Sequence, residues 1–242
     1  MCIPAASWRW RCWPDPCTRD VRSLLRCAAH AGKLEKLDVT LAVAAARCSS
    51  EQHETLLPLH LNLMADSVVA EGEILAPLHH ALSGTGRQPS QTVLEINPSA
   101  AALQPELLLA GLHRLRRLGY RIALDGVGAG NYPLTVIVEA RPDLIKMDRE
   151  IVAGLPCETS CVAVLEALQH LAARIGTQIV AEGVKCAEQL TTLRQYGVGI
   201  AQGDLLGDSD GQCAGVVCVG DVVHGVAQLN IERAAALHPL TR

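Results

Sequence analysis

The sequence predicts an α/β fold in which parallel strands alternate with helices and close into a barrel. Candidate strands and helices recur about every 30–40 residues, the rhythm of right-handed βαβ units. Hydrophobic residues make up 49% of the 242 residues but aromatic residues only 2%, so the core must consist mainly of Leu, Val, Ile and Ala. Such a core suits helices packed on buried parallel strands. Because no G-x-G-x-x-G motif opens the first unit, a barrel is favoured over a dinucleotide-binding sheet.

Apolar spacing and turn residues predict the elements in order. Gly32 interrupts the first helix, Asn97-Pro98 stops the second strand, and Gly119 is a C-cap signal for the helix before it. Spacings of three and four residues predict helices over 21–49, 66–82, 101–118, 133–140, 158–175 and 186–196. Short apolar or alternating runs predict strands over 57–63, 92–96, 121–124, 143–147, 178–181 and 199–201.

Charge, cysteine content and hydropathy argue against several classes of protein. The net charge is −4 and no basic stripe dominates, so nucleic acid is not an expected partner. The ten cysteines form no CxxC pair and no zinc-like spacing with His, which suits a reducing cytosol. The sequence has no signal-peptide apolar region and no run of 18 apolar residues. We therefore expect a cytoplasmic protein without a membrane span.

Polar residues lie at or near the ends of six successive predicted strands. In a barrel of parallel strands, chemistry gathers at the carboxyl ends of the strands, so a convergent site is expected there. Alternatively, Glu95 and Asp125 could simply cap the helices that follow them. The six residues are Asn62, Glu95, Asp125, Lys146, Glu182 and Gln202.

Six segments of the chain share the order and spacing of one family's motifs. They are LHLNL, VLEIN, ALDGVGAGNYPL, PDLIKMD, IVAEGV and AQGDLLG, and they resemble VNlS, ExTE, DDFGTGYSSL, DxxKID, AEGVE and QGY of the EAL-domain family. Upstream, AASWRW resembles EALxRW and AGKLEKLD resembles GLIxxLD. The resemblance runs from about residue 5 to residue 206 of a single domain predicted over 1–242, with 207–242 as a C-terminal extension. It implies a TIM-like barrel of the EAL type. We expect that barrel to lack the family's first strand, because the sequence begins at the EALxRW-like segment.

The family resemblance also implies a chemistry and a role for each site residue. EAL domains hydrolyse cyclic-di-GMP with Mg²⁺ or Mn²⁺, and two such ions can activate a water and neutralise developing charge. The metal ligands would be Asn62, Glu95 and Asp125, and the catalytic residues Lys146 and Glu182. The ligand-binding residues would be Arg9, Gln202 and Asp148.

Departures from the family pattern weaken the implied metal site. Ala5 stands where the family has the metal-ligating Glu of EAL, Gly126 replaces the second Asp of the DD pair, and Lys185 replaces the second Glu of AEGVE. In the same way Asn97-Pro98 replaces Thr-Glu, and Val127 replaces Phe. The first three changes shift the local charge by about four units, where one charge pair at 4 Å is worth roughly 1–4 kcal/mol. A paired-metal site should therefore be severely weakened, while one ion on Asn62, Glu95 and Asp125 remains conceivable.

Three functions follow from this mixture of retained and lost residues. The leading hypothesis is a degenerate, non-hydrolytic EAL-like module in cyclic-di-GMP signalling. It would bind either cyclic-di-GMP or a protein partner. That partner is another protein or a second copy of this chain. The second hypothesis is a weak, metal-dependent cyclic-di-GMP phosphodiesterase. The third is a decayed fragment that binds no ligand.

Overall fold

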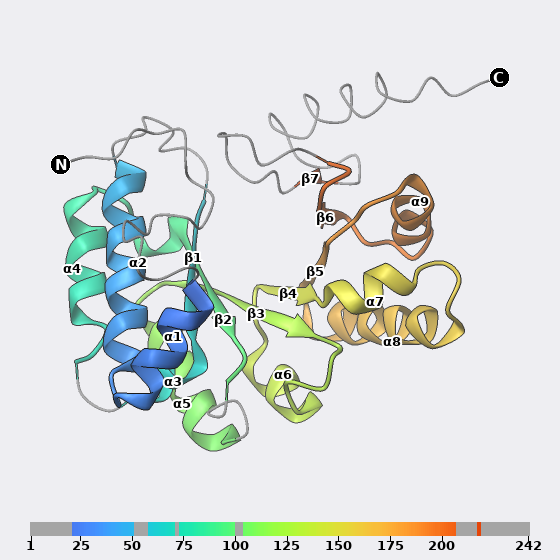
Figure 1. Cartoon of the computed structure of the whole chain (residues 1–242). Helices are drawn as coiled ribbons and strands as arrows, with labels where there is room; N and C mark the ends of the chain where they lie inside the picture. Colours follow the sequence, from blue (N-terminus) through green and yellow to red (C-terminus); the bar gives the residue numbers. More distant parts are fainter. Residues whose placement is uncertain (1–20, 51–57, 71–72, 100–103, 207–216, 219–242) are drawn as a thin grey trace. The chain divides into compact units, whose positions relative to one another are not determined.

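A computed structural model of the chain describes residues 21–50, 58–70, 73–99, 104–206 and 217–218 (Figure 1). These residues belong to two compact units, an N-terminal unit within Asp15–Leu144 and a C-terminal unit within Ile145–Arg242. Strands and helices alternate in both units, as the sequence predicts. Ala5, Arg9 and the question of a missing first strand lie outside the described residues.

The N-terminal unit is built on three parallel strands that follow one another in chain order. Leu59 of the first strand pairs with Thr92 of the second, and Val93 of the second pairs with Arg121 of the third. The strands are β1 (Leu59–Met64), β2 (Thr92–Asn97) and β3 (Arg121–Val127). The helices are α1 (Val21–His30), α2 (Leu34–Ser50), α3 (Ala65–Val69), α4 (Ala76–Gly84), α5 (Pro105–Arg117) and α6 (Leu134–Ala140), and a short 3-10 helix, η2, covers Pro89–Gln91. Helices α2 and α4 pack side by side (Figure 1).

Strand β1 shows how the sequence sets apart a core face and a polar face. Leu61 and Leu63 are buried, whereas His60 and Asn62, which alternate with them, are only partly buried. Since side chains alternate between the two faces of a strand, His60 and Asn62 share one face. The opposite face contributes to the aliphatic core, whose fully buried members include Leu61, Leu63, Leu94, Ile96, Leu108, Leu115, Ile122 and Leu124.

A buried carboxylate on α2 fixes the end of β1. Oδ2 of Asp38 accepts hydrogen bonds from the Met64 backbone N–H at 2.9 Å and from the Ser67 hydroxyl at 2.6 Å. Burial raises the pKa of Asp38 above its usual 3.8, although both hydrogen bonds oppose the shift. The Asp of the LEKLD segment therefore ties α2 to the junction between β1 and α3.

The C-terminal unit continues the alternation of strands and helices. Strands β5 and β6 are parallel, and β7 pairs with β6 in the antiparallel direction. The strands are β4 (Leu144–Met147), β5 (Gln178–Glu182), β6 (Ile200–Gln202) and β7 (Val217–Cys218). The helices are α7 (Arg149–Gly154), α8 (Thr159–Ile175) and α9 (Ala187–Gln195).

The loops after β5 and β6 approach each other closely at Gly203. This residue has φ +156°, and a Cβ atom there would lie 2.2 Å from the Val184 nitrogen. Only glycine permits such an approach. The Val184 N–H also donates to the Gln202 carbonyl at 3.1 Å. This contact holds the carboxyl ends of β5 and β6 together.

The structure differs from the predicted elements in several places, since neither η2 nor β7 was predicted and three further differences concern helices and β3. The helix predicted over 66–82 is two helices, α3 and α4, and Pro77 lies in the first turn of α4, where its missing N–H costs nothing. Helix α7 was not predicted, and Asp148 begins it as an N-cap. Strand β3 extends to Val127, three residues beyond its predicted end, so it includes Asp125 and Gly126.

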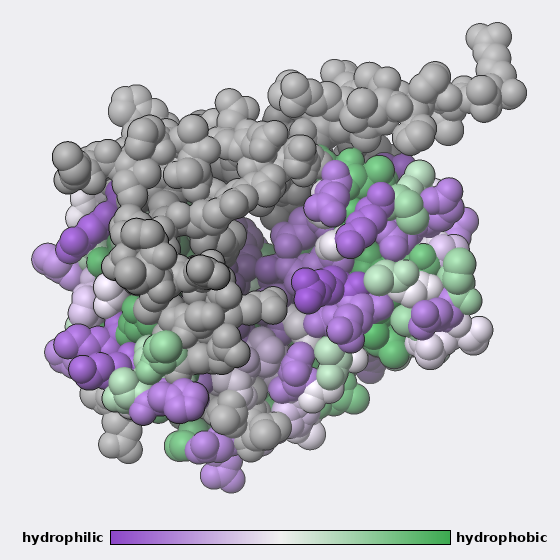
Figure 2. Space-filling model, in the orientation of Figure 1, coloured by the Kyte–Doolittle hydropathy of each residue, from purple (hydrophilic) through white to green (hydrophobic). Residues whose placement is uncertain are grey.

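Apolar residues lie mainly in the interior of the described parts. Figure 2 shows that hydrophilic residues cover much of the described surface in this view, with apolar residues in small separate areas. Among the described residues, no helix has the length and apolar character needed to cross a membrane.

Candidate functional site

The three predicted metal ligands lie at the ends of the three strands of the N-terminal unit. Asn62 of β1 and Glu95 of β2 are direct partners in the parallel register. On β3, Asp125 follows Leu124, which is the partner of Ile96. The strand-end pattern in the sequence therefore corresponds to a row of residues along one edge of β1, β2 and β3.

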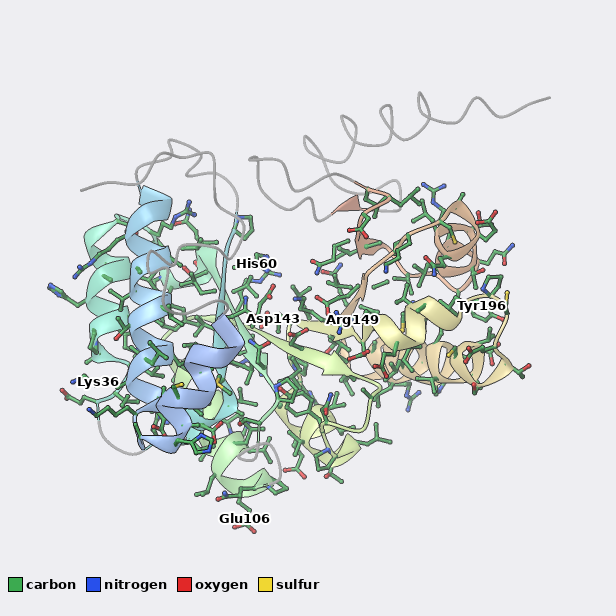
Figure 3. All side chains as sticks on the ribbon, viewed as in Figure 1. Lys36, His60, Glu106, Asp143, Arg149 and Tyr196 are labelled. Carbon is green, nitrogen blue, oxygen red and sulfur yellow. The ribbon has the colours of Figure 1, made fainter. Side chains whose placement is uncertain are left out.

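Glu95 is held by a histidine of the neighbouring strand. Nδ1 of His60 lies 2.6 Å from Oε1 of Glu95, and only 7% of Glu95 is exposed (Figure 3 labels His60 on β1). His60 is the register partner of Val93, so it reaches Glu95 diagonally, two residues further along β2. A buried carboxylate needs a hydrogen-bonded or charged partner, and His60 supplies one.

Asn62 is held by a second diagonal contact between the same strands. The side-chain amide of Asn97 donates to Oδ1 of Asn62 at 2.7 Å. Asn97 is the register partner of Met64, two residues beyond Asn62. The oxygen through which Asn62 would bind a metal therefore accepts a hydrogen bond from within the protein.

Asp125 lies near a buried phenol, that of Tyr132. The Tyr132 hydroxyl donates to the Ile96 carbonyl at 2.6 Å. Burial raises the pKa of Tyr132 far above its usual value, and the negative charge of Asp125 raises it further. Next to Asp125, Gly126 has φ +67°, and its carbonyl accepts a hydrogen bond from the Asn131 side chain at 3.0 Å.

Three predicted site residues meet in the C-terminal unit. Nζ of Lys146 on β4 lies 2.6 Å from Oε1 of Glu182 on β5. The side-chain amide of Gln202 on β6 donates to the same oxygen at 2.7 Å, and Gln202 is the register partner of Glu182. Lys146 is 7% exposed, so its ammonium is buried and paired with Glu182.

The other predicted residues in the C-terminal unit have different surroundings. Oδ1 of Asp148 accepts a hydrogen bond from the Glu150 N–H at 2.7 Å, so Asp148 is the N-cap of α7. Its predicted contact with a ligand stays a prediction. The side chain of Lys185 is exposed, and its backbone N–H donates to the Gln189 side chain at 2.8 Å. The Lys185 ammonium, which stands where the family has a Glu carboxylate, is therefore exposed to solvent.

The helix-cap alternative for Glu95 and Asp125 is wrong. Helix α5, which follows β2, has Gln104 at its N-cap position, and helix α6, which follows β3, has Pro133 there. Neither helix has a side-chain cap. The carboxylates of Glu95 and Asp125 therefore have another role than closing a helix end.

The donors present do not match a ready-formed two-metal site. In the described part of the chain, no three His, Cys, Asp or Glu side chains are grouped so that they could hold one ion. The Asn62 oxygen and one Glu95 oxygen already accept hydrogen bonds, and Gly126 offers no carboxylate. The sequence thus lacks a carboxylate at Gly126, and in the structure the Asn62 oxygen and one Glu95 oxygen are hydrogen-bonded within the protein.

Sequence reasoning missed His60, the partner of Glu95. Two signals could have indicated it. His60 precedes Asn62 by two residues, so both belong to one face of a strand. Its polar side chain also lies between Leu59 and Leu61 in the strand Leu59–Met64.

Comparisons with known proteins identify the family of this chain. A family model described as the EAL domain matches residues 13–209. RocR of Pseudomonas aeruginosa, named a cyclic di-GMP phosphodiesterase, is 35% identical over 117 residues, which are 48% of this chain and 30% of RocR. The chain spans only 16–30% of the length of several relatives that it matches.

Solved structures agree with this result. The EAL domain of Mycobacterium smegmatis DcpA matches with a TM-score of 0.65 and 26% identity, covering 72% of this chain and 79% of that one. Klebsiella pneumoniae BlrP1, in a complex with calcium and cyclic-di-GMP, matches with a TM-score of 0.71 and 23% identity, covering 78% of this chain and 48% of BlrP1. The predicted α/β fold of the EAL type is confirmed, and the chain belongs to the EAL domain family.

Proposed function

We propose that this chain is a degenerate EAL domain of cyclic-di-GMP signalling, which binds the cyclic dinucleotide without hydrolysing it efficiently. Membership of the EAL family supports the connection to this nucleotide, because RocR is named as a phosphodiesterase of cyclic di-GMP and BlrP1 was solved with it. The residues of the site support the loss of efficient hydrolysis.

One observation carries the proposal. Two of the retained metal-ligand residues are each bound by a neighbouring side chain of the same unit: Glu95 by His60, and Asn62 by Asn97. In a two-metal enzyme, oxygens of this kind coordinate cations that activate water and stabilise the transferred phosphoryl group. Here the protein itself supplies their positive or hydrogen-donating partners.

The electrostatics of the remaining residues also disfavour a second ion. Gly126 provides no oxygen side chain beside Asp125, and Lys185 carries a positive charge where the family has a carboxylate. Divalent cations such as Mg²⁺ need several hard oxygen ligands. Without two ions, developing charge on the phosphate would depend on Lys146 alone, and its ammonium is shared with Glu182.

Binding makes smaller demands than hydrolysis. A bound phosphodiester needs hydrogen-bond donors and a neutralising charge, and the buried ammonium of Lys146 provides both. Arg9, Gln202 and Asp148 remain the predicted contacts for the rest of the dinucleotide. In this proposal Mg²⁺ or Mn²⁺ binds at most weakly, at Asn62, Glu95 and Asp125.

A calorimetric titration of the full chain with cyclic-di-GMP tests the proposal. We expect saturable heat in EDTA, no linear dinucleotide in the recovered sample, and loss of binding in Lys146→Met. The exposed Lys185→Met is the matched control and should bind like the wild type. The absence of heat at high micromolar dinucleotide would overturn ligand binding and leave a protein-interaction module.

The second candidate function is a weak, metal-dependent phosphodiesterase. The contact between Lys146 and Glu182 favours it, because both match catalytic positions of the family. Slow formation of linear dinucleotide in Mn²⁺, abolished in Glu182→Gln, would establish this activity. If no product forms after long incubation with Mn²⁺, the enzyme hypothesis fails.

Partners and location remain predictions. A protein partner or a homodimer is tested by light scattering of the purified chain, alone and with cyclic-di-GMP. The cytoplasmic location is tested by fractionation. The decayed-fragment hypothesis predicts a non-cooperative thermal melt, whereas the aliphatic core of both units leads us to expect a cooperative one.

A further inference from the structure

Two strand-end residues, His60 and Asn97, contact the retained metal-ligand residues of β1 and β2. His60 and Asn62 lie two residues apart on β1, and Glu95 and Asn97 lie two residues apart on β2. Asn62 and Glu95 are register partners, so all four side chains share one face of the strand pair. We call these four residues the β1–β2 quartet.

Two diagonal hydrogen bonds close the quartet. One joins His60 Nδ1 to Glu95 Oε1 at 2.6 Å, and the other joins Asn97 Nδ2 to Asn62 Oδ1 at 2.7 Å. The Asn97 amide also lies 3.4 Å from the Glu95 carbonyl oxygen. Each strand therefore contributes one donor and one acceptor.

The direction of both bonds follows from the chemistry of the groups. An ionised carboxylate only accepts hydrogen bonds, so Nδ1 of His60 carries the hydrogen. This holds both for the protonated imidazole and for the neutral tautomer with a hydrogen on Nδ1. The Asn97 amide nitrogen is likewise only a donor. One oxygen of Glu95 and the side-chain oxygen of Asn62 thus each have an N–H group directed at them.

We propose that His60 and Asn97 take the place of a divalent cation at Asn62 and Glu95, so that this corner of the site is closed to metal by the protein itself. The inference deepens the proposed function, and its relevance to the dinucleotide rests on that function. It gives a structural reason why a site that keeps Asn62 and Glu95 would still bind Mg²⁺ or Mn²⁺ poorly.

The same hydrogen bonds could in principle support a bound metal from behind, as outer residues often do. The position of the donors argues against such support. His60 and Asn97 project from the same strand face as the two acceptors, and each N–H is directed at an oxygen that a cation would need. In addition, no third His, Cys, Asp or Glu among the described residues joins His60 and Glu95 in a metal-binding group. A cation at Glu95 Oε1 would therefore compete with the His60 N–H.

Binding of Mn²⁺ to the nucleotide-free full chain tests the proposal, with free Mn²⁺ measured by electron paramagnetic resonance. The variants are His60→Ala, Asn97→Ala and the double variant, and His113→Ala on the exposed face of α5 is the matched control. We expect the wild type and His113→Ala to bind Mn²⁺ weakly. Each single variant should bind about tenfold more tightly, since one hydrogen bond to a ligand oxygen is removed. The double variant should bind more tightly than either.

The opposite results would overturn the proposal. Weaker Mn²⁺ binding in His60→Ala would make His60 a metal ligand or a supporting residue, and unchanged binding would show that it does not compete. Tight binding by the wild type would contradict closure directly. Thermal melts show whether each variant folds. If His60→Ala fails to fold, Asn97→Ala provides the test. Because no nucleotide is present, the outcome is independent of whether the chain binds cyclic-di-GMP.

Discussion

His60 and Glu95 form a 2.6 Å contact between two neighbouring parallel strands, β1 and β2, across the place where an EAL domain presents metal ligands. Lys146 and Glu182 make a contact of the same length in the C-terminal unit. Both retained glutamates are thus matched to a nitrogen donor of the protein. These two glutamates therefore have partners within the protein in place of an ion, which favours ligand binding over two-metal hydrolysis.

Removal of the Lys146 ammonium should destabilise the protein. Lys146→Met removes the ammonium beside the partly buried Glu182 carboxylate, and we expect a loss of up to about 3 kcal/mol in the free energy of unfolding. Lys146→Met combined with Glu182→Gln should lose less than Lys146→Met alone, since the carboxylate that the ammonium stabilised is then neutral. Urea unfolding measures both, with the exposed Lys185→Met as a control expected within about 0.5 kcal/mol of the wild type. Equal losses in Lys146→Met and Lys185→Met would contradict the pairing.

The buried Asp38 should make stability depend on pH above about 4. Burial raises the pKa of Asp38 in the folded state above its usual 3.8, so the folded chain holds this proton more tightly than the unfolded chain. The resulting stabilisation is present below the unfolded pKa and is lost as pH rises through the folded pKa. Asp38→Asn keeps an acceptor for the Met64 and Ser67 donors but cannot ionise. The wild type should therefore lose stability relative to Asp38→Asn as pH rises from 4 to 7. A constant difference in urea unfolding over this range would show that Asp38 does not titrate abnormally.

His79 should have the opposite effect at higher pH. Its Nδ1 lies 2.7 Å from the Tyr120 hydroxyl, and burial, helped by the nearby Arg114, lowers the pKa of His79 below 6.5. The unfolded chain then binds this proton more readily, so the stabilisation is present above the unfolded pKa of about 6.5 and is lost as pH falls from there through the lower folded pKa. Between pH 7.5 and 5.5, His79→Gln should flatten the fall in melting temperature. His80→Gln, on the exposed neighbour in the same helix, should leave the fall unchanged, and equal slopes in both variants would refute this role.

A carboxylate at position 126 should partly restore a metal site. Gly126 has φ +67°, a left-handed conformation that Asp adopts at a modest cost, so the substitution is compatible with the turn. Gly126→Asp combined with His60→Ala should bind Mn²⁺ more tightly than His60→Ala alone, as measured by the depletion of free Mn²⁺. Gly126→Asn with His60→Ala is the matched control, with the same shape and no charge. If the Asp and Asn variants bind equally, the missing charge at Gly126 is not what weakens the site.

The sequence predicted the polar residues at the strand ends better than the bounds and number of the helices. The positions of Asn62, Glu95 and Asp125 followed from strand periodicity and motif register, because the ends of buried strands are marked by polar residues after apolar runs. The break between α3 and α4 was missed because helical spacing continues through the segment before Pro77. Helix α7 was missed because six residues are too few to show a period, although Asp148 is a recognisable N-cap.

The internal contacts of the site could not be predicted in the same way. His60 and Glu95 are 35 residues apart, and their contact depends on the register between β1 and β2, which periodicity does not specify. The contact between Asn97 and Asn62 has the same origin. From the sequence, Asn97 was recognised only as a departure from the family's Thr. Because Asn97 is the register partner of Met64, two residues beyond Asn62, its side-chain amide reaches the Asn62 oxygen.

The metal dependence of cyclic-di-GMP binding tests the central claim most directly. The full wild-type chain is titrated with the dinucleotide once in EDTA and once in excess Mn²⁺, and the two dissociation constants are compared. We predict equal values and no linear product, because His60 and Asn97 already supply the partners that an ion at Glu95 and Asn62 would supply. Binding at least about tenfold tighter in Mn²⁺, equivalent to about 1.4 kcal/mol, would contradict a metal-independent site.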